Sequence, residues 1–263
     1  MLLEGYRRED PPPQPRLAVP VAVPNLIYMC MANKGDKEKC VGDLSLIAFY
    51  YLLRVGEYTH HKPSDKRRTQ QFRLCDIAFW HNNTQLDASL SITHLLQHCT
   101  AATLNISNQK NGIRAQTIHH EALNTQLCPV RALIRRVKYI RTHTADTNTI
   151  IATYYTKKGK RRCVSARMIN NAVKNAVTTL GLEKQGLQKH LVGSHSLRAG
   201  GAMAMHLQGI SDTTIKKLGR WSTDTFLMYI HSQISAFSRG LSKQMSTPVN
   251  FHNIAFQPTN RLT

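Results

Sequence analysis

The stretch HSLRAGGAMAMHLQGISDTTIKKLGRWSTDTFLMYIH, residues 195–231, is the most informative part of this chain. Its beginning predicts a helix over residues 193–208, on which His195 and Arg198 lie one turn apart. The small residues AGGAMA that follow would let this helix pack closely against its neighbours. The sequence therefore places an imidazole and a guanidinium side by side, and the other basic and aromatic residues decide what the pair does.

The rest of the chain predicts a mainly helical fold with one small antiparallel β-sheet, which is an α+β class. One further helix is expected behind an N-cap at Asp43, and another with Pro129 in its first turn. Three more are expected over residues 165–182, with closure at Gly181, over 211–219 and over 222–237. Strand-like segments occupy residues 72–80, 102–109 and 112–120. The last two are joined at Asn111-Gly112, a strong hairpin turn signal.

The charge of the chain points to a polyanionic partner. Lys and Arg number 35 against 15 Asp and Glu, which gives a formal net charge of +20. An excess of this size repels itself in a compact fold unless a polyanion neutralises it, so nucleic acid is the expected partner. An anionic membrane surface is the alternative, but no strongly amphipathic basic helix stands out.

Cysteine usage and hydropathy place the protein inside the cell. The six cysteines are scattered without a CxxC pair, which is typical of reduced thiols and not of a disulfide frame or a zinc site. The apolar stretch LAVPVAVPNLIYMC is broken by Pro20 and Pro24, so we expect neither a signal peptide nor a membrane span.

The domain organisation is expected to be simple. Residues 1–24 predict a Pro-rich linker or arm, residues 25–245 one large domain, and residues 246–263 a tail.

The residues available for chemistry favour phosphoryl transfer without a metal ion. With fifteen acidic residues and no acidic cluster at site-like spacing, a magnesium site is not expected. Metal-free transfer needs cationic donors for the phosphate oxygens, a side-chain nucleophile and an acid for the leaving oxygen. Candidates follow one another along the chain: Arg54, Lys110, His195, Arg198, Trp221 and Tyr229.

These six residues resemble the signature of the tyrosine recombinases, the phage-integrase and Cre-like family. That signature has H-x-x-R, then a His or Trp about two dozen residues on, then a Tyr on the next helix, and this chain has all three. LLRVGEYT resembles the family's first-arginine motif, with Glu57 three positions after the Arg, and NISNQKNGIRAQTI resembles its lysine-bearing β-hairpin. The segments QKNG, LCPVRAL and GRWSTDTFLMYI are most similar to recombinases of eukaryotic mobile elements, the Crypton and DIRS-like groups.

The resemblance implies a role for each residue. Arg54 and Arg198 would each contact a non-bridging oxygen of the scissile phosphate. His195 would add a donor or assist in deprotonating the nucleophile, and Trp221 would donate its indole N–H or close the site.

For the covalent step, the resemblance implies that Tyr229 attacks phosphorus to form a 3′-phosphotyrosyl link, with Lys110 protonating the leaving 5′-oxygen. Glu57 would orient His195. No cofactor, metal or ATP is needed, because the phosphodiester energy is kept in the intermediate.

The same resemblance sets expectations about partners and location. Double-stranded DNA would be the substrate, with assembly on DNA towards a tetramer, in the nucleus if the source is eukaryotic and otherwise in the cytoplasm or nucleoid. Most family members carry a helical core-binding domain before the catalytic one, and here only 53 residues precede Arg54, so that domain is expected to be absent.

Three alternatives stay open. The chain could be a type IB topoisomerase-like enzyme, a domesticated non-catalytic DNA-binding derivative of a recombinase, or a plain basic helical RNA- or DNA-binding module. The basic cluster KKGKRR is expected to contact DNA, and could equally be a nuclear import signal or a solvated loop. Its cationic residues are Lys157, Lys158, Lys160, Arg161 and Arg162.

Overall fold

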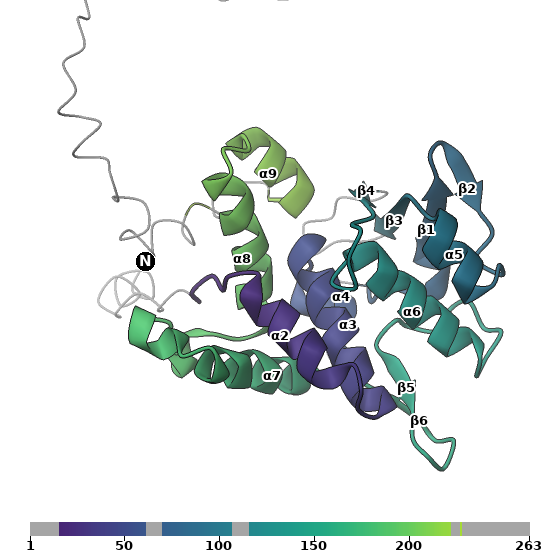
Figure 1. Cartoon of the computed structure of the whole chain (residues 1–263), viewed down its shortest axis with the longest axis horizontal. Helices are drawn as coiled ribbons and strands as arrows, with labels where there is room; N and C mark the ends of the chain where they lie inside the picture. Colours follow the sequence, from purple (N-terminus) through teal and green to yellow (C-terminus); the bar gives the residue numbers. More distant parts are fainter. Residues whose placement is uncertain (1–15, 62–69, 107–115, 222–226, 228–263) are drawn as a thin grey trace, which may run out of the picture.

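A computed structural model describes residues 16–61, 70–106, 116–221 and 227 of the chain, as helices with a small antiparallel sheet (Figure 1). The helices are α2 (Ala22–Met31), α3 (Asp36–Tyr50), α4 (Val55–Tyr58), α5 (Ile92–His98), α6 (Pro129–Arg141), α7 (Ala166–Thr179), α8 (Ser194–Leu207) and α9 (Asp212–Gly219). Short 3-10 turns lie at Leu74–Asp76, Leu182–Gln185 and Lys189–Leu191. The strands are β1 (Ile77–His81), β2 (Thr84–Leu86), β3 (Ala101–Ile106), β4 (Gln116–Glu121), β5 (Thr153–Tyr155) and β6 (Arg161–Cys163). The expected fold class is confirmed.

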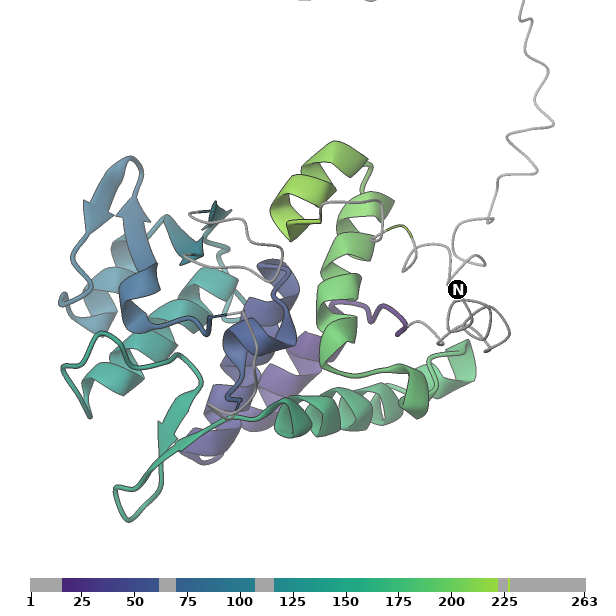
Figure 2. The same ribbon diagram turned by 180° about the vertical axis from the view of Figure 1, so that it is seen from behind.

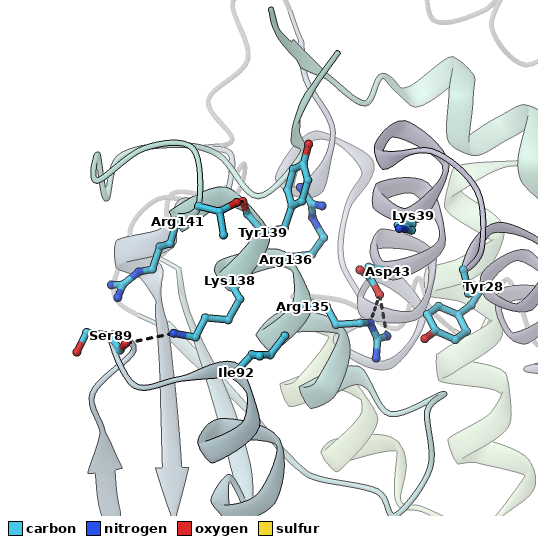
Figure 3. A pocket seen from close by; sticks show the side chains of 12 residues that line it. Tyr28, Lys39, Asp43, Ser89, Ile92, Arg135, Arg136, Lys138, Tyr139 and Arg141 are labelled. Atoms are coloured by element: carbon cyan, nitrogen blue, oxygen red, sulfur yellow. Dashed lines mark hydrogen bonds and ion pairs between the residues drawn. The ribbon is translucent and has the colours of Figure 1, made fainter. Parts of the chain in front are cut away.

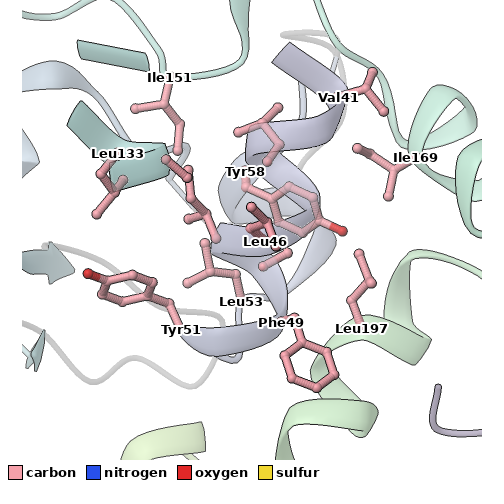
Figure 4. Packing of buried hydrophobic residues seen from close by; sticks show 14 of the residues in the cluster. Val41, Leu46, Phe49, Tyr51, Leu53, Tyr58, Leu133, Ile151, Ile169 and Leu197 are labelled. Carbon is pink, nitrogen blue, oxygen red and sulfur yellow. The ribbon is translucent and has the colours of Figure 1, made fainter. Parts of the chain in front are cut away.

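Helix α3 is the centre of the core. Its residues from Cys40 to Phe49 are all buried, so the helix is covered on every side. It packs against α2, α6, α7, α8 and strand β5. Figure 4 shows how Val41, Leu46 and Phe49 of this helix meet apolar side chains from those neighbours. Because α3 is packed on all sides, its C-terminal end is held firmly in place, and the candidate site lies just after that end.

The predicted hairpin between strands β3 and β4 is confirmed. The four-stranded sheet has the order β2-β1-β3-β4, with all neighbours antiparallel. Ile106 of β3 lies opposite Gln116 of β4. Lys110 and the predicted Asn111-Gly112 turn lie outside the described residues.

The basic cluster forms a second hairpin that the sequence did not reveal as strands. β5 and β6 pair antiparallel, with Tyr155 opposite Arg161. Gly159 adopts φ +70 in the turn, and the Thr156 amide donates to the Lys160 carbonyl at 3.0 Å. All five cations of the cluster are exposed: Lys157, Lys158, Lys160, Arg161 and Arg162.

Two expectations near the start of the chain are wrong. Residues 16–24 do not form a free linker, because the Val19 amide donates to the Ser196 carbonyl and Val23 is buried in the first turn of α2. Asp43 is not an N-cap, because α3 begins seven residues earlier behind Gly35. Asp43 instead lies in the middle of α3, buried against Arg135 of α6.

Close packing of α8 is confirmed. A Cβ at Gly200 would collide with the backbone carbonyl of Val19, and one at Gly201 with that of Phe49. Only glycine allows this approach, so α8 lies directly against α3 and the segment before α2 (Figure 2). Gly209 (φ +76) follows α8, and Ser211 caps α9, both as expected.

All six cysteines are described, and each is a free thiol. Among the described helices, none has the length and apolar character that crossing a bilayer would need.

Candidate active site

The first expected arginine lies where the chain turns from α3 into α4. The Arg54 amide donates to Oε2 of Glu57 at 2.7 Å, and its guanidinium Nη1 lies 3.3 Å from Oε1. The carboxylate thus accepts a hydrogen bond from a backbone amide at the start of α4 that has no partner within the helix, which explains the three-residue spacing of Arg54 and Glu57. The Arg54 side chain keeps a fifth of its surface exposed, whereas the Glu57 side chain is buried.

The second expected arginine, Arg198 on α8, reaches the same place from a distant part of the sequence. Its Nη1 donates to the Leu52 carbonyl at 2.5 Å, and its Nη2 donates to the Gly219 carbonyl at the end of α9. The Trp221 ring covers this guanidinium, with Cζ of Arg198 4.2 Å from the ring centroid. Arg198 therefore joins α3, α8 and α9 at one point, and Trp221 closes it on one side.

A third arginine completes the cluster, and sequence reasoning missed it. Arg220 donates from Nη1 to Oε1 of Glu57 at 2.8 Å and from Nη2 to Oε2 at 3.0 Å. Its Nη2 also lies 2.9 Å from the Leu52 carbonyl, and its own carbonyl accepts from Arg54 Nη2 at 3.0 Å. Arg220 lies between Gly219 and Trp221, and the sequence pattern assigns a role to each of these two neighbours but none to Arg220.

Two residues of the cluster have left-handed backbone conformations. Leu52 has φ 48 and Arg220 has φ 58, a region that residues with a Cβ rarely adopt. The Leu52 carbonyl accepts from both Arg198 and Arg220, and the Arg220 side chain is held by Glu57. These charge-assisted bonds offset the strain and keep both conformations in place. The predicted end of α9 at Gly219 is confirmed, and the left-handed Arg220 follows it.

The cluster keeps its one carboxylate ionised. Burial acts to raise the pKa of Glu57, but the charge and hydrogen bonds of Arg220, the nearby Arg198 and the Arg54 amide outweigh it, so the pKa is lowered. Three guanidinium groups thus surround one carboxylate. The excess of positive charge is what a phosphate group requires.

His195 lies in the first turn of α8, one turn before Arg198, and is exposed. The expected contact from Glu57 is corrected, because the hydrogen bonds of that carboxylate go to Arg54 and Arg220. Arg220 fills the space beside Glu57, so the carboxylate positions arginines and not the imidazole.

Two further residues expected in the site, Lys110 and Tyr229, cannot be placed relative to the arginine cluster. Tyr229 lies outside the described residues, as does Lys110. The base of the Lys110 hairpin is described, and there Nε2 of Gln116 donates to the Lys217 carbonyl of α9 at 3.3 Å. Strand β4 therefore begins beside α9, the helix that immediately precedes Arg220. Among the described residues, no group of three or more His, Cys, Asp or Glu side chains is arranged to hold a metal ion.

Solved structures with the same fold are DNA recombinases. The XerH site-specific recombinase in a post-cleavage complex with palindromic difH substrate has a TM-score of 0.54 at 12% identity, over 88% of this chain and 54% of that one. The same recombinase in a pre-cleavage complex has a TM-score of 0.51 at 12% identity, over 90% of this chain and 56% of that one. The XerA recombinase has a TM-score of 0.50 at 18% identity, over 91% of this chain and 68% of that one.

The chain thus has the fold of tyrosine recombinase catalytic domains, and it spans about half the length of the XerH chain. No family model matches the sequence, and no curated protein matches it significantly.

Proposed function

We propose that this chain, with its recombinase fold, breaks and rejoins double-stranded DNA through Tyr229, without metal or ATP. The observation that carries the proposal is the meeting of Arg54 and Arg198. They are far apart in sequence, yet both bind the chain around Leu52, Glu57 and Arg220. A structural role for each arginine alone would not require them to converge.

The three arginines would divide the work of binding the scissile phosphate. Arg54 is the most exposed of them and would present its guanidinium to a non-bridging oxygen. Arg198 would supply the second fork, with Trp221 holding its plane. Arg220 would add positive electrostatic potential at the phosphate and hold the Glu57 carboxylate in an ion pair.

The covalent step follows the chemistry of tyrosine attack. The phenolate oxygen of Tyr229 would form a bond to phosphorus while the bond to the 5′-oxygen breaks. Lys110 would give that oxygen its proton. His195, exposed one turn before Arg198, would assist the loss of the Tyr229 proton. Attack by the freed 5′-hydroxyl on the phosphotyrosine reverses the step and rejoins the strand.

Duplex DNA would lie along the exposed cations of the β5–β6 hairpin. Those five side chains stand clear of the core and could neutralise backbone phosphates. We further propose assembly on DNA into an oligomer, nuclear action and an origin in a Crypton- or DIRS-like mobile element. The support for these is the sequence resemblance.

The test is formation of a covalent protein–DNA adduct, seen on a denaturing gel. Nicked duplexes of randomised sequence would be incubated in EDTA with the wild type and with Tyr229→Phe. An adduct formed by the wild type alone supports the proposal. An adduct that persists in Tyr229→Phe contradicts the assigned nucleophile. Duplex binding with no adduct, even after fusion to a separate DNA-binding domain, would favour a non-catalytic DNA-binding protein instead.

A further inference from the structure

A cavity of about 790 Å³ lies between α2, α3, α5 and α6, away from the arginine cluster, and is here called the α3/α6 pocket (Figure 3). This volume is in the range of small-molecule sites. It is lined by Tyr28, Ala32, Lys39, Asp43, Ser89, Ile92, Arg135, Arg136, Lys138, Tyr139, Arg141 and Thr142. Lys39 precedes Tyr50, the end of α3, by eleven residues or about 17 Å of helix, so the pocket is separate from the arginine cluster.

The pocket carries a strong excess of positive charge. Five cations line it against one carboxylate, Asp43, and Arg135 pairs with that carboxylate at 2.7 Å. Arg136 is 1% exposed, and its hydrogen bonds go to the carbonyls of Ile151 and Thr153, which carry no formal charge. Its guanidinium also lies over the Tyr139 ring, 5.0 Å from the centroid, and since none of these partners carries a formal charge, its positive charge acts on the cavity.

Two cations stand at opposite ends of the pocket, ready for an anion. Lys39 is exposed on α3, and Arg141 lies at the end of α6 (Figure 3). Neither side chain forms a hydrogen bond or ion pair with another described residue, although the charge of Arg141 also acts on the Asp87 carboxylate. Lys138, between them, is bound to the carbonyls of Ala88 and Ser89 and holds the loop before α5 in place.

The floor of the pocket is a flat surface made by a guanidinium and an aromatic ring, unlike a site for a bare inorganic anion. The Arg135 guanidinium lies over the Tyr28 ring, 4.6 Å from its centroid, and forms a flat surface. Ile92 stands across from it on α5, 42% exposed to the pocket mouth. A flat aromatic group could lie between these surfaces, because guanidinium planes and tyrosine rings both stack on nucleobases.

We infer that the α3/α6 pocket binds a nucleotide unit, with its base against Tyr28, Arg135 and Ile92 and its phosphate at Lys39 or Arg141. The unit could be a free nucleotide or one residue of a single-stranded nucleic acid. Close by, the His143 and Tyr155 rings stack in parallel at 4.2 Å beside Tyr139, which would extend the surface for a strand.

The test is isothermal titration calorimetry of the full chain at 150 mM salt, with AMP, inorganic phosphate and unlabelled (dT)10 as separate probes. Lys39→Glu/Arg141→Glu reverses the two free cations of the pocket, and Lys34→Glu/Lys184→Glu makes the same charge change on exposed residues outside it. We expect AMP to bind at least tenfold more weakly to the pocket variant and within twofold of wild type to the control. Ile92→Asp should weaken AMP binding as well.

Each arm of the titration has a meaning. Tighter binding of (dT)10 than of AMP, lost in the pocket variant alone, identifies a strand as the ligand, and the reverse identifies a free nucleotide. Phosphate binding as tightly as AMP, equal loss in the two charge-reversal variants, or no binding of AMP and (dT)10 would overturn the inference. Covalent adduct formation by Tyr229 is expected to be unchanged in the pocket variant, so this test and the test of the proposed function fail independently.

Discussion

Two buried carboxylates, Glu57 in the arginine cluster and Asp43 in the α3/α6 pocket, are both held by arginine, yet their pKa values are shifted in opposite directions. Glu57 accepts from Arg220 through both oxygens and from the Arg54 amide, and its pKa is lowered. Asp43 is paired with Arg135 through one oxygen, burial dominates, and its pKa is raised. The number of donors on a buried carboxylate therefore decides in which direction its pKa moves.

The largest effect is expected when Glu57 is neutralised. Glu57→Gln leaves the buried Arg220 guanidinium without its charge partner, and breaking such a pair costs about 3–5 kcal/mol. Because the folded pKa of Glu57 lies below its ordinary value of 4.5, this contribution is present above pH 4.5 and is lost as the pH falls through the folded value. Urea unfolding of both proteins at pH 7 and below 4.5 measures it. A gap in stability that stays constant over this range contradicts the account.

Replacing arginine by lysine separates the two regions by function. Arg198→Lys keeps the charge but loses the planar fork, and should slow adduct formation about 10²–10³-fold. Arg136→Lys makes the same change in the buried arginine of the α3/α6 pocket, where the rate of adduct formation should be unchanged and only stability should suffer. The readout is the rate of adduct formation with the folded fraction of each variant measured by circular dichroism. Equal rates for the two variants would refute the assignment of Arg198.

Asp43 should respond to pH in the opposite sense to Glu57. Its folded pKa is raised above the ordinary 3.8, so it contributes most to stability below pH 3.8 and loses that contribution as the pH rises through the folded value. Asp43→Asn should therefore change stability at pH 7 by only about 1 kcal/mol, since the partly exposed Arg135 can reach water. Thermal unfolding against pH provides the measurement. A wild-type advantage that grows with pH would contradict this, because it would show that the folded pKa of Asp43 is lowered like that of Glu57.

The smallest effect concerns the basic hairpin. Lys157→Gln, Lys158→Gln and Lys160→Gln together should lower the slope of log affinity for duplex DNA against log salt by about 2–3, since each phosphate contact contributes about 0.9. The same change at Lys34, Lys37 and Lys184 removes equal charge elsewhere. Equal slopes in the two triple variants would mean that the hairpin does not contact DNA.

Much of the fold could be predicted because its signals are local. Pro129 opens α6, Ser211 caps α9, and Gly181 with φ 65 closes the region after α7. Each of these residues acts through its own backbone geometry, which the sequence displays directly. The β3–β4 hairpin was visible for the same reason, since alternating apolar residues flank a strong turn signal.

The parts that escaped prediction depend on tertiary contacts. The start of α3 at Asp36 was hidden because a helix buried on all sides shows no apolar stripe. Helix α2 was hidden by Pro24, which a first turn tolerates. Arg220 was missed because its left-handed backbone is unusual for arginine and is held by Glu57, far away in sequence.

The most direct test of the central claim is to identify the residue that carries the DNA. Trypsin cuts after Arg220 and Arg239, so a peptide of residues 221–239 would contain Tyr229 as its only tyrosine. The trapped adduct would be digested and its DNA-linked peptide sequenced by mass spectrometry. We expect the nucleotide on Tyr229 of that peptide. A nucleotide on any other residue would contradict the proposed active site.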